Sequence, residues 1–178
     1  MTAPTDIPPG YAIRRHQPED DPSLLAIENR AAELFRDHGY PEIADNPLAS
    51  VADFRAMAEG CPVWVATGAQ GLPVGYAVAL PLGPFFHLRE LSVDPAHGRR
   101  GLGGALVRTV VEAARERGFE AVSLTTFRTV PFNQPFYEKL GFAERPLETA
   151  PQALRDAFHR ELPEGMDPAA RVLMLLSL

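Results

Sequence analysis

Apolar residues recur three or four positions apart in two stretches of the chain, which is the spacing of one face of an α-helix. In residues 20–38 the apolar positions are Leu24, Ile27, Ala31, Leu34 and Phe35, and Gly39 predicts the end of this helix. Between Gly101 and Gly118 they are Leu102, Ala105, Leu106, Val110 and Ala113. Shorter helices are expected over residues 51–58, 135–140 and 154–162.

Runs rich in β-forming residues predict strands at 11–16, 63–67, 74–80, 86–93, 121–126 and 172–178, with a short one beginning at Phe142. The strand at 86–93, the following helix and the strand at 121–126 predict a right-handed crossover between two parallel strands. The strands at 63–67 and 74–80 predict a hairpin. The expected fold class is therefore α/β (α+β), with a mixed central β-sheet flanked by helices, in a single domain over residues 1–178.

The composition is that of an ordinary folded protein, with 46% apolar and 22% charged residues. No apolar run approaches the roughly 18 to 20 residues that a membrane-spanning helix requires. The first ten residues show no basic stretch followed by an apolar one, so no secretory signal is expected. Cys61 is the single cysteine, which excludes an intrachain disulfide and favours a small buried side chain over a nucleophile. We therefore expect a cytoplasmic protein without a membrane partner.

The formal net charge of −6 argues against a nucleic-acid partner and would suit a cationic substrate. Residues 97–117 go against this trend, because two glutamates there are outnumbered by five arginines: Arg99, Arg100, Arg108, Arg115 and Arg117. This local excess of positive charge indicates either an anionic ligand or a solvated helix face.

A glycine-rich turn separates the strand that ends at Val93 from the helix that follows Gly101. The first turn of a helix leaves backbone N–H groups without partners, and the helix dipole adds partial positive charge there. Arg99 and Arg100 add two guanidinium groups, so the turn is a candidate pyrophosphate site. The simpler alternative is a turn that only eases the chain into the helix. A dinucleotide fingerprint is excluded because Leu106 occupies its third glycine position. A P-loop is excluded because the sequence has no G-K-S or G-K-T triplet.

Two motifs in this part of the chain occur together in a known family. The pattern R/Q-x-x-G-x-G/A is filled at all six positions by Arg100, Gly101, Leu102, Gly103, Gly104 and Ala105. Further on, Asn133 precedes a short helix bearing Tyr137, and Gly141-Phe142 follow it. From Glu90 to Phe142 the chain resembles the GNAT superfamily of acyl-CoA-dependent N-acetyltransferases. It departs from the family's common pattern in one respect, since Asn133 lies closer in sequence to the tyrosine than the asparagine of that pattern does.

The resemblance implies an enzyme that moves an acetyl group from acetyl-CoA to a primary amine by direct attack on the thioester. It implies that the main chain of Leu91, Ser92 and Val93 binds the pantetheine arm and polarises the thioester carbonyl. Tyr137 would protonate the departing CoA thiolate. Asn133 would donate a hydrogen bond to the CoA arm, or else Asn133 or Gln134 would cap the helix that begins near Pro135.

The attacking amine must first lose a proton, since an alkylamine has a pKa of about 10.4. Glu90 is the favoured proton acceptor, and His87 is a second candidate on the same strand. Glu90 could instead pair with Arg89, and His87 could be an ordinary strand histidine. The other histidines show no metal-ligand spacing, so we expect no metal.

Several alternatives remain at this stage. The chain could transfer a longer acyl group, or acylate a hydroxyl or thiol. It could also be a catalytically inactive acyl-CoA-binding sensor or interaction domain, or a purely structural domain. The acceptor, a small-molecule or peptide amine, is expected to bind residues 20–47 and the tail from Pro146, where Glu28, Glu33 and Arg36 could face it. The apolar end at 172–178 could add a strand across a homodimer interface.

Overall fold

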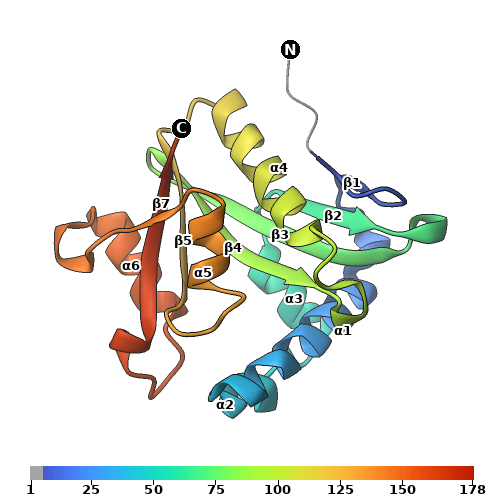
Figure 1. Cartoon of the computed structure of the whole chain (residues 1–178), viewed down its shortest axis with the longest axis horizontal. Coiled ribbons are helices and arrows are strands. Elements are labelled where there is room, and N and C mark those ends of the chain that lie inside the picture. The colour runs from blue at the N-terminus through green and yellow to red at the C-terminus, as the bar shows by residue number, and fades with distance from the viewer. Residues whose placement is uncertain (1–5) are drawn as a thin grey trace. The chain divides into compact units, whose positions relative to one another are not determined.

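The computed structural model describes residues 6–178 (Figure 1). Its strands are β1 (Ala12–Arg15), β2 (Val63–Thr67), β3 (Pro73–Leu82), β4 (Phe85–Val93), β5 (Ala121–Phe127), β6 (Ala143–Glu144) and β7 (Arg171–Ser177). Its α-helices are α1 (Asp21–Ala32), α2 (Pro41–Asp45), α3 (Val51–Ala58), α4 (Leu102–Glu116), α5 (Gln134–Lys139) and α6 (Gln152–Glu161). The predicted elements are present, except that the helix expected over residues 20–38 is divided in two. Within residues 6–178, each helix is too short or too polar to cross a bilayer.

The strands form one mixed sheet in the order β1-β2-β3-β4-β5-β7-β6. The pairs β1–β2, β2–β3, β5–β7 and β6–β7 are antiparallel. β4 and β5 are parallel, with His87 opposite Ser123. The connection between these two strands runs through α4, which confirms the predicted strand–helix–strand unit and the mixed-sheet fold class.

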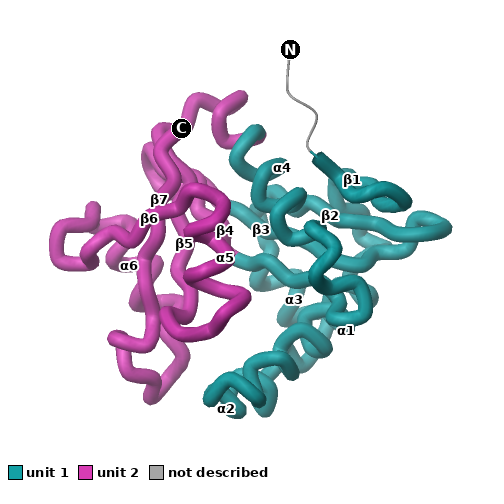
Figure 2. Tube along the Cα trace, viewed as in Figure 1, with its two compact units in different colours: residues 1–79, 90–112 teal, residues 80–89, 113–178 magenta. Residues whose placement is uncertain are grey.

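The chain divides into two compact units, which are coloured separately in Figure 2. Unit 1 comprises residues 1–79 and 90–112, of which 6–79 and 90–112 are described; unit 2 comprises residues 80–89 and 113–178. Along the chain, β3, β4 and α4 each pass from one unit into the other. The single domain over residues 1–178 stays a prediction.

Unit 1 has a core between its strands and the helices α1 and α3. The side chains that form it are Leu24, Ile27, Phe54, Val63, Val65, Tyr76 and Val78. Leu24 and Ile27 are the buried face that the helical period of the sequence predicts. Cys61 is half-buried and packs against this cluster, so it is a small packing residue, though not a fully buried one.

The predicted helix over 20–38 is two helices. α1 ends at Ala32 and continues as the 3₁₀ helix η2 (Glu33–His38), which ends at Gly39 as predicted. Because a 3₁₀ helix has three residues per turn, positions beyond Ala32 leave the apolar stripe of α1. Leu34 is 42% exposed, whereas Leu24 and Ile27 on α1 are fully buried.

Unit 2 has its own core, formed by α6 and the sheet. Ala150, Leu154, Phe158 and Leu173 are its buried side chains. β7 pairs along β5 from Ala121–Ser177 to Phe127–Arg171, and β6 pairs with its other edge. β7 thus lies between β5 and the two-residue strand β6 in the sheet of its own chain. The homodimer stays a prediction.

Candidate active site

The connection from β4 to α4 is held by an ion pair. Asp94 follows β4, and its Oδ2 accepts a hydrogen bond from Nη2 of Arg30 on α1 at 2.6 Å. Its Oδ1 accepts from the N–H of Ala96, at the start of the 3₁₀ helix η4 (Pro95–His97), at 3.0 Å. Burial favours a higher pKa for Asp94, but the Arg30 guanidinium and the Ala96 N–H together hold the pKa below its usual value of 3.8. The carboxylate is therefore charged at neutral pH and fixes the start of the turn.

Two residues of the turn adopt left-handed backbone conformations, Arg99 with φ of 57° and Gly101 with φ of 85°. Glycine adopts this conformation without a steric penalty, whereas arginine does so at a cost. A non-glycine residue held in this region is often part of a functional loop. The strain at Arg99 thus marks the turn that the sequence singled out.

α4 begins directly after Gly101, and the N–H of Ala105 donates to the carbonyl of Gly101 at 3.0 Å. By helix geometry, the amides of Leu102, Gly103 and Gly104 precede this first intrahelical bond. Leu102 and Gly104 are buried, whereas Gly103 is half-buried. The start of the 15-residue helix therefore carries the partial positive charge of its dipole beside two exposed arginines, Arg99 and Arg100.

Arg100 is anchored by a residue that the sequence analysis did not identify. Its Nη1 donates to the hydroxyl of Tyr11 at 3.0 Å, and that hydroxyl lies 2.9 Å from Nδ1 of His97. The rings of Tyr11 and His97 also meet edge to face, with centroids 5.7 Å apart. Local sequence patterns could not predict this contact, because Tyr11 and the turn are some 90 positions apart in the chain.

The last residues of β4 lie against β3. Ser92 is buried, and Glu90, Leu91 and Val93 are half-buried. Ser92 Oγ donates to Oε1 of Glu90 at 3.0 Å. Gly75 of β3 is so close that a Cβ there would lie 3.0 Å from the Ser92 carbonyl oxygen and 3.2 Å from Cγ2 of Val93. A glycine at position 75 therefore lets β3 approach the end of β4 this closely.

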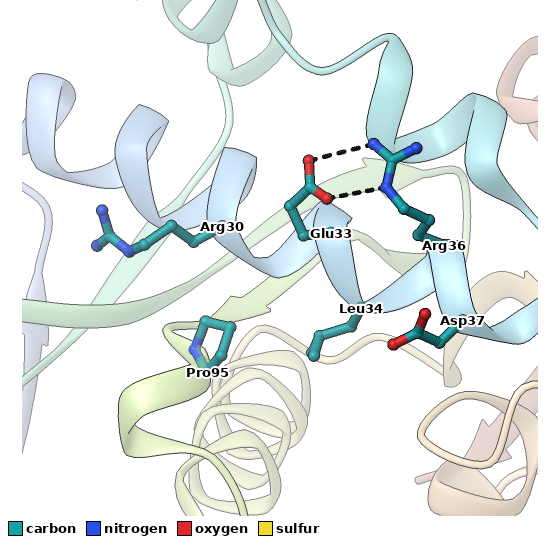
Figure 3. Close-up of a pocket in the computed structure, with 6 residues that line it drawn as sticks. All are labelled: Arg30, Glu33, Leu34, Arg36, Asp37 and Pro95. Carbon is teal, nitrogen blue, oxygen red and sulfur yellow. Dashed lines mark hydrogen bonds and ion pairs between the residues drawn. The ribbon is translucent and has the colours of Figure 1, made fainter.

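Beside this end of β4, unit 1 has an open hollow of about 500 Å³, lined by Arg30, Glu33, Leu34, Arg36, Asp37 and Pro95. In the view of Figure 3, Leu34 lies between Pro95 and Asp37, and the Glu33–Arg36 pair lies above them. Nε of Arg36 donates to Oε2 of Glu33 at 3.1 Å, and Arg36 also pairs with Asp45 at 2.9 Å. Glu33 and Arg36, which the sequence analysis considered as residues that face the acceptor substrate, therefore line this hollow. They are already paired with each other.

His87 lies in unit 2 and is fully buried. Its Nδ1 is 2.9 Å from Ser123 Oγ, and its Nε2 is 2.9 Å from Oε1 of Glu161 on α6. Thr125 Oγ1 donates to the other carboxylate oxygen of Glu161 at 2.6 Å. Burial favours a higher pKa for Glu161, but His87, Thr125 and the charge of Arg171 lower the pKa overall. With both ring nitrogens engaged and no exposed surface, His87 has the contacts of a structural histidine.

Tyr137 is on α5 in unit 2 and is 8% exposed. Its ring meets the rings of Phe136 and Phe142 edge to face, with centroids 4.9 and 5.7 Å away. Pro135 in the first turn of the helix and Gly141 after its end give the predicted short helix its bounds. Phe136 and Phe142 therefore hold the ring that the second sequence motif singled out.

Asn133 precedes α5 without capping it through its side chain. Its Oδ1 accepts a hydrogen bond from Thr126 Oγ1 at 2.7 Å, whereas its Nδ2 is buried and has no partner in the described part of the chain. The capping alternative for Asn133 is therefore wrong. A buried amide donor without a partner is costly, so Nδ2 has an unused hydrogen-bonding capacity.

The predicted site residues thus fall into two sets. Unit 1 holds Glu90, Leu91, Ser92, Val93 and the turn from Arg99 to Ala105, and unit 2 holds Asn133 and Tyr137. Among residues 6–178, no three His, Cys, Asp or Glu side chains gather in a way that could hold a metal ion.

Comparison with known proteins supports the fold and the motifs together. The model of the Acetyltransferase (GNAT) family matches residues 22–142. The glucosamine 6-phosphate N-acetyltransferase of Trypanosoma brucei brucei is 33% identical over 110 residues, covering 57% of this chain and 72% of that protein. A GCN5-related N-acetyltransferase structure from Rhodopseudomonas palustris superimposes with a TM-score of 0.72 at 24% identity, covering 97% of this chain and 98% of that one.

A further structural neighbour was solved with coenzyme A, the PaiA N-acetyltransferase of Thermoplasma acidophilum. Its TM-score is 0.69 at 16% identity, with 94% of this chain and 99% of that chain covered. Since the family match covers more than half of the sequence, the chain belongs to the GNAT family of acetyltransferases. This confirms the resemblance that the two sequence motifs indicated.

Proposed function

We propose that this chain is an enzyme that transfers the acetyl group of acetyl-CoA to a primary amine by direct attack on the thioester. The start of α4 is the observation that carries the proposal. There the left-handed Gly101 turns the chain into a helix whose first amides lie beside Arg99 and Arg100. This combination of free amides, helix dipole and guanidinium groups suits a diphosphate better than any neutral ligand.

The turn from Arg99 to Ala105 would bind the pyrophosphate of CoA. The amides supply hydrogen bonds, and the arginines supply charge without needing to be buried. Arg100 is held in place by Tyr11 at 3.0 Å before any ligand arrives, so less side-chain entropy is lost on binding.

The main chain of Leu91, Ser92 and Val93 would bind the pantetheine arm and the thioester carbonyl. Gly75 of β3 packs directly against the Ser92 carbonyl and Val93, which would limit the movement of a backbone N–H at this position. A fixed N–H directed at the carbonyl oxygen stabilises the negative charge that develops there during attack.

The proton lost by the amine would go to Glu90, directly or through a water molecule. Glu90 is half-buried and lies on the same strand as the proposed thioester site. His87 is less suitable because it is fully buried and both of its ring nitrogens already have partners.

In unit 2, Tyr137 would protonate the CoA thiolate, since a phenol with a pKa of about 10 can donate to that leaving group. Asn133 would donate the hydrogen of its unpartnered Nδ2 to the CoA arm. The acceptor class in this proposal is a small-molecule or peptide amine. The relative named a glucosamine 6-phosphate N-acetyltransferase makes that amino sugar a reasonable first compound to test.

The experiment is the release of CoA from acetyl-CoA with a panel of primary amines, which includes glucosamine 6-phosphate, alkylamines, lysine and short peptides. Calorimetry of acetyl-CoA binding accompanies it. Binding together with turnover on at least one amine supports the proposal. Tight binding without turnover on any amine would indicate an acyl-CoA sensor, and no heat with acetyl-CoA would leave only a structural role.

A further inference from the structure

The hydroxyl of Tyr11 has two hydrogen-bond partners but only one proton. It lies 3.0 Å from Nη1 of Arg100 and 2.9 Å from Nδ1 of His97. A guanidinium group can only donate, so the phenol oxygen is the acceptor in the contact with Arg100. The hydroxyl proton is left for the other contact, where an unprotonated Nδ1 accepts it. By this network, neutral His97 carries its ring proton on Nε2.

Protonation of His97 would reverse the second of these hydrogen bonds. The added proton would occupy Nδ1, which would become a donor. The oxygen of Tyr11 would then face two cationic donors, Arg100 and the imidazolium, and its own proton would lose its acceptor. Histidine is the side chain whose charge ordinarily changes between pH 5 and 8. The support that Tyr11 gives to Arg100 is therefore linked to the charge of a histidine.

The surroundings of His97 determine what an added charge would do. His97 is the half-buried last residue of η4, and the ring of Tyr11 covers it edge to face from the segment before β1. Asp94 lies at the start of the same turn, where the Arg30 guanidinium and the Ala96 N–H hold its pKa below the usual 3.8 although burial opposes them. Asp94 therefore stays charged above pH 5.

The carboxylate of Asp94 is already paired, since it accepts a hydrogen bond from Arg30 at 2.6 Å. On the other side, His97 and the guanidinium of Arg100 lie within hydrogen-bond distance of the same phenol oxygen. An imidazolium at position 97 would thus be only partly neutralised by its neighbours. It would add to the positive charge at the start of α4.

We propose that His97 is a further residue of the pyrophosphate site. When neutral it positions Arg100 through Tyr11, and when protonated it adds a third positive charge beside Arg99 and Arg100. Acetyl-CoA should therefore bind more tightly as the pH falls from 8 to 5.5. This inference rests on the proposed function, because that function assigns the turn to the pyrophosphate of CoA.

Two effects of protonation oppose each other. The weaker hold on Arg100 should reduce affinity about threefold, the effect of one lost hydrogen bond. The added charge attracts both negative charges of a pyrophosphate, and at a half-buried position salt screens it only in part. We expect this attraction to raise affinity about tenfold. The net result is binding about threefold tighter at pH 5.5 than at pH 8.

The probe for the test is dephospho-CoA, which has the pyrophosphate of CoA but lacks its phosphate monoester. A monoester with a pKa of about 6 would itself change charge in this pH range and hide the effect of the protein. Calorimetry of the full chain at pH 8 and 5.5, in about 0.15 M sodium chloride, measures the affinity. Thermal unfolding at both pH values checks that the protein is folded.

The variant is His97→Gln, whose side-chain oxygen can still accept from Tyr11 but cannot gain a charge. It should bind dephospho-CoA like the wild type at pH 8 and no more tightly at pH 5.5. The control is His159→Gln, which removes an exposed histidine on α6 in unit 2. This control should keep the threefold pH response of the wild type.

A second measurement follows the ring of His97 directly. Its nitrogen-15 NMR resonances are assigned by their disappearance in His97→Gln. In the free protein at pH 8 they should show a proton on Nε2 and none on Nδ1. With dephospho-CoA bound, the midpoint of their titration should move to higher pH, because a ligand that prefers the protonated form stabilises it.

The outcomes separate this inference from the proposed function. An affinity for dephospho-CoA that is equal at the two pH values, or weaker at pH 5.5, would overturn the role of His97. A wild-type pH response in His97→Gln would do the same, and in each case the pyrophosphate site would stand. If neither acetyl-CoA nor dephospho-CoA binds at either pH, the proposed function fails, and this inference fails with it.

Discussion

The hydroxyl of Tyr11 accepts a hydrogen bond from Nη1 of Arg100 at 3.0 Å, although 89 positions separate the two residues in the chain. Arg100 occupies the first position of the phosphate-turn motif. Tyr11 lies directly before β1 and also contacts His97. The N-terminal strand of unit 1 thus helps to order the turn proposed to bind the pyrophosphate.

Replacing Tyr11 with Phe should weaken acetyl-CoA binding about threefold, because Arg100 loses one hydrogen bond and must be ordered on binding. Isothermal titration calorimetry measures the change. Tyr40→Phe, a substitution of the half-buried tyrosine before α2, is the control and should bind acetyl-CoA like the wild type. An unchanged affinity in Tyr11→Phe would show that the contact with Arg100 has no role in binding.

Replacing Gly103 with Leu should weaken acetyl-CoA binding by at least about tenfold, since a side chain there would keep a diphosphate from the first amides of α4. The control is Glu116→Leu, which places the same side chain at an exposed position in the last turn of α4. Both variants should keep a cooperative thermal unfolding transition. Full affinity in Gly103→Leu would contradict the phosphate assignment.

Replacing Tyr137 with Phe should lower kcat about 100-fold and leave acetyl-CoA affinity within about a factor of two, because only the departing sulfur requires the phenol proton. The aromatic contacts with Phe136 and Phe142 would remain, so the fold should be unaffected. Steady-state kinetics and calorimetry on the same preparation separate the two effects. A variant with wild-type kcat would remove Tyr137 from the mechanism.

Replacing Glu161 with Gln should lower the free energy of unfolding at pH 7 by about 1–3 kcal/mol, since the buried His87 loses a charged partner. The pKa of Glu161 is lowered in the folded state, so its stabilisation is complete above the unfolded-state pKa and is lost as the pH falls through the folded-state pKa. Urea denaturation at pH 7, 5, 4 and 3 should therefore show that the free energy of unfolding falls less steeply with decreasing pH in the variant than in the wild type. Equal slopes would mean that Glu161 does not contribute to this loss.

The sequence predicted most of the fold because its long helices and strands have clear periods. α4 is the best example, since its apolar stripe and its glycines at both ends are local features. The division of the 20–38 helix after Ala32 was not predicted, because Leu34 and Phe35 continue the helical spacing and only three-dimensional packing distinguishes the two helices.

The candidate site shows the same limit. The phosphate turn is contiguous, so its residues could be recognised one after another. Tyr11 could not, because it contacts Arg100 and His97, which are distant in sequence, and it lies in no motif. The capping role considered for Asn133 was inferred from neighbouring residues alone. In the structure its side chain accepts a hydrogen bond from Thr126 and does not cap the helix.

The position of the end of β4 depends on the absence of a side chain at Gly75 in β3. Its bare backbone leaves a gap that the Ser92 carbonyl fills, so any added side chain would displace the segment proposed to bind the thioester. In a saturation mutagenesis screen for activity, position 75 should tolerate almost no replacement, although it belongs to no recognisable signature and carries no chemistry of its own. The positions at which substitution abolishes activity would then include residues at contacts between strands as well as residues of the motifs.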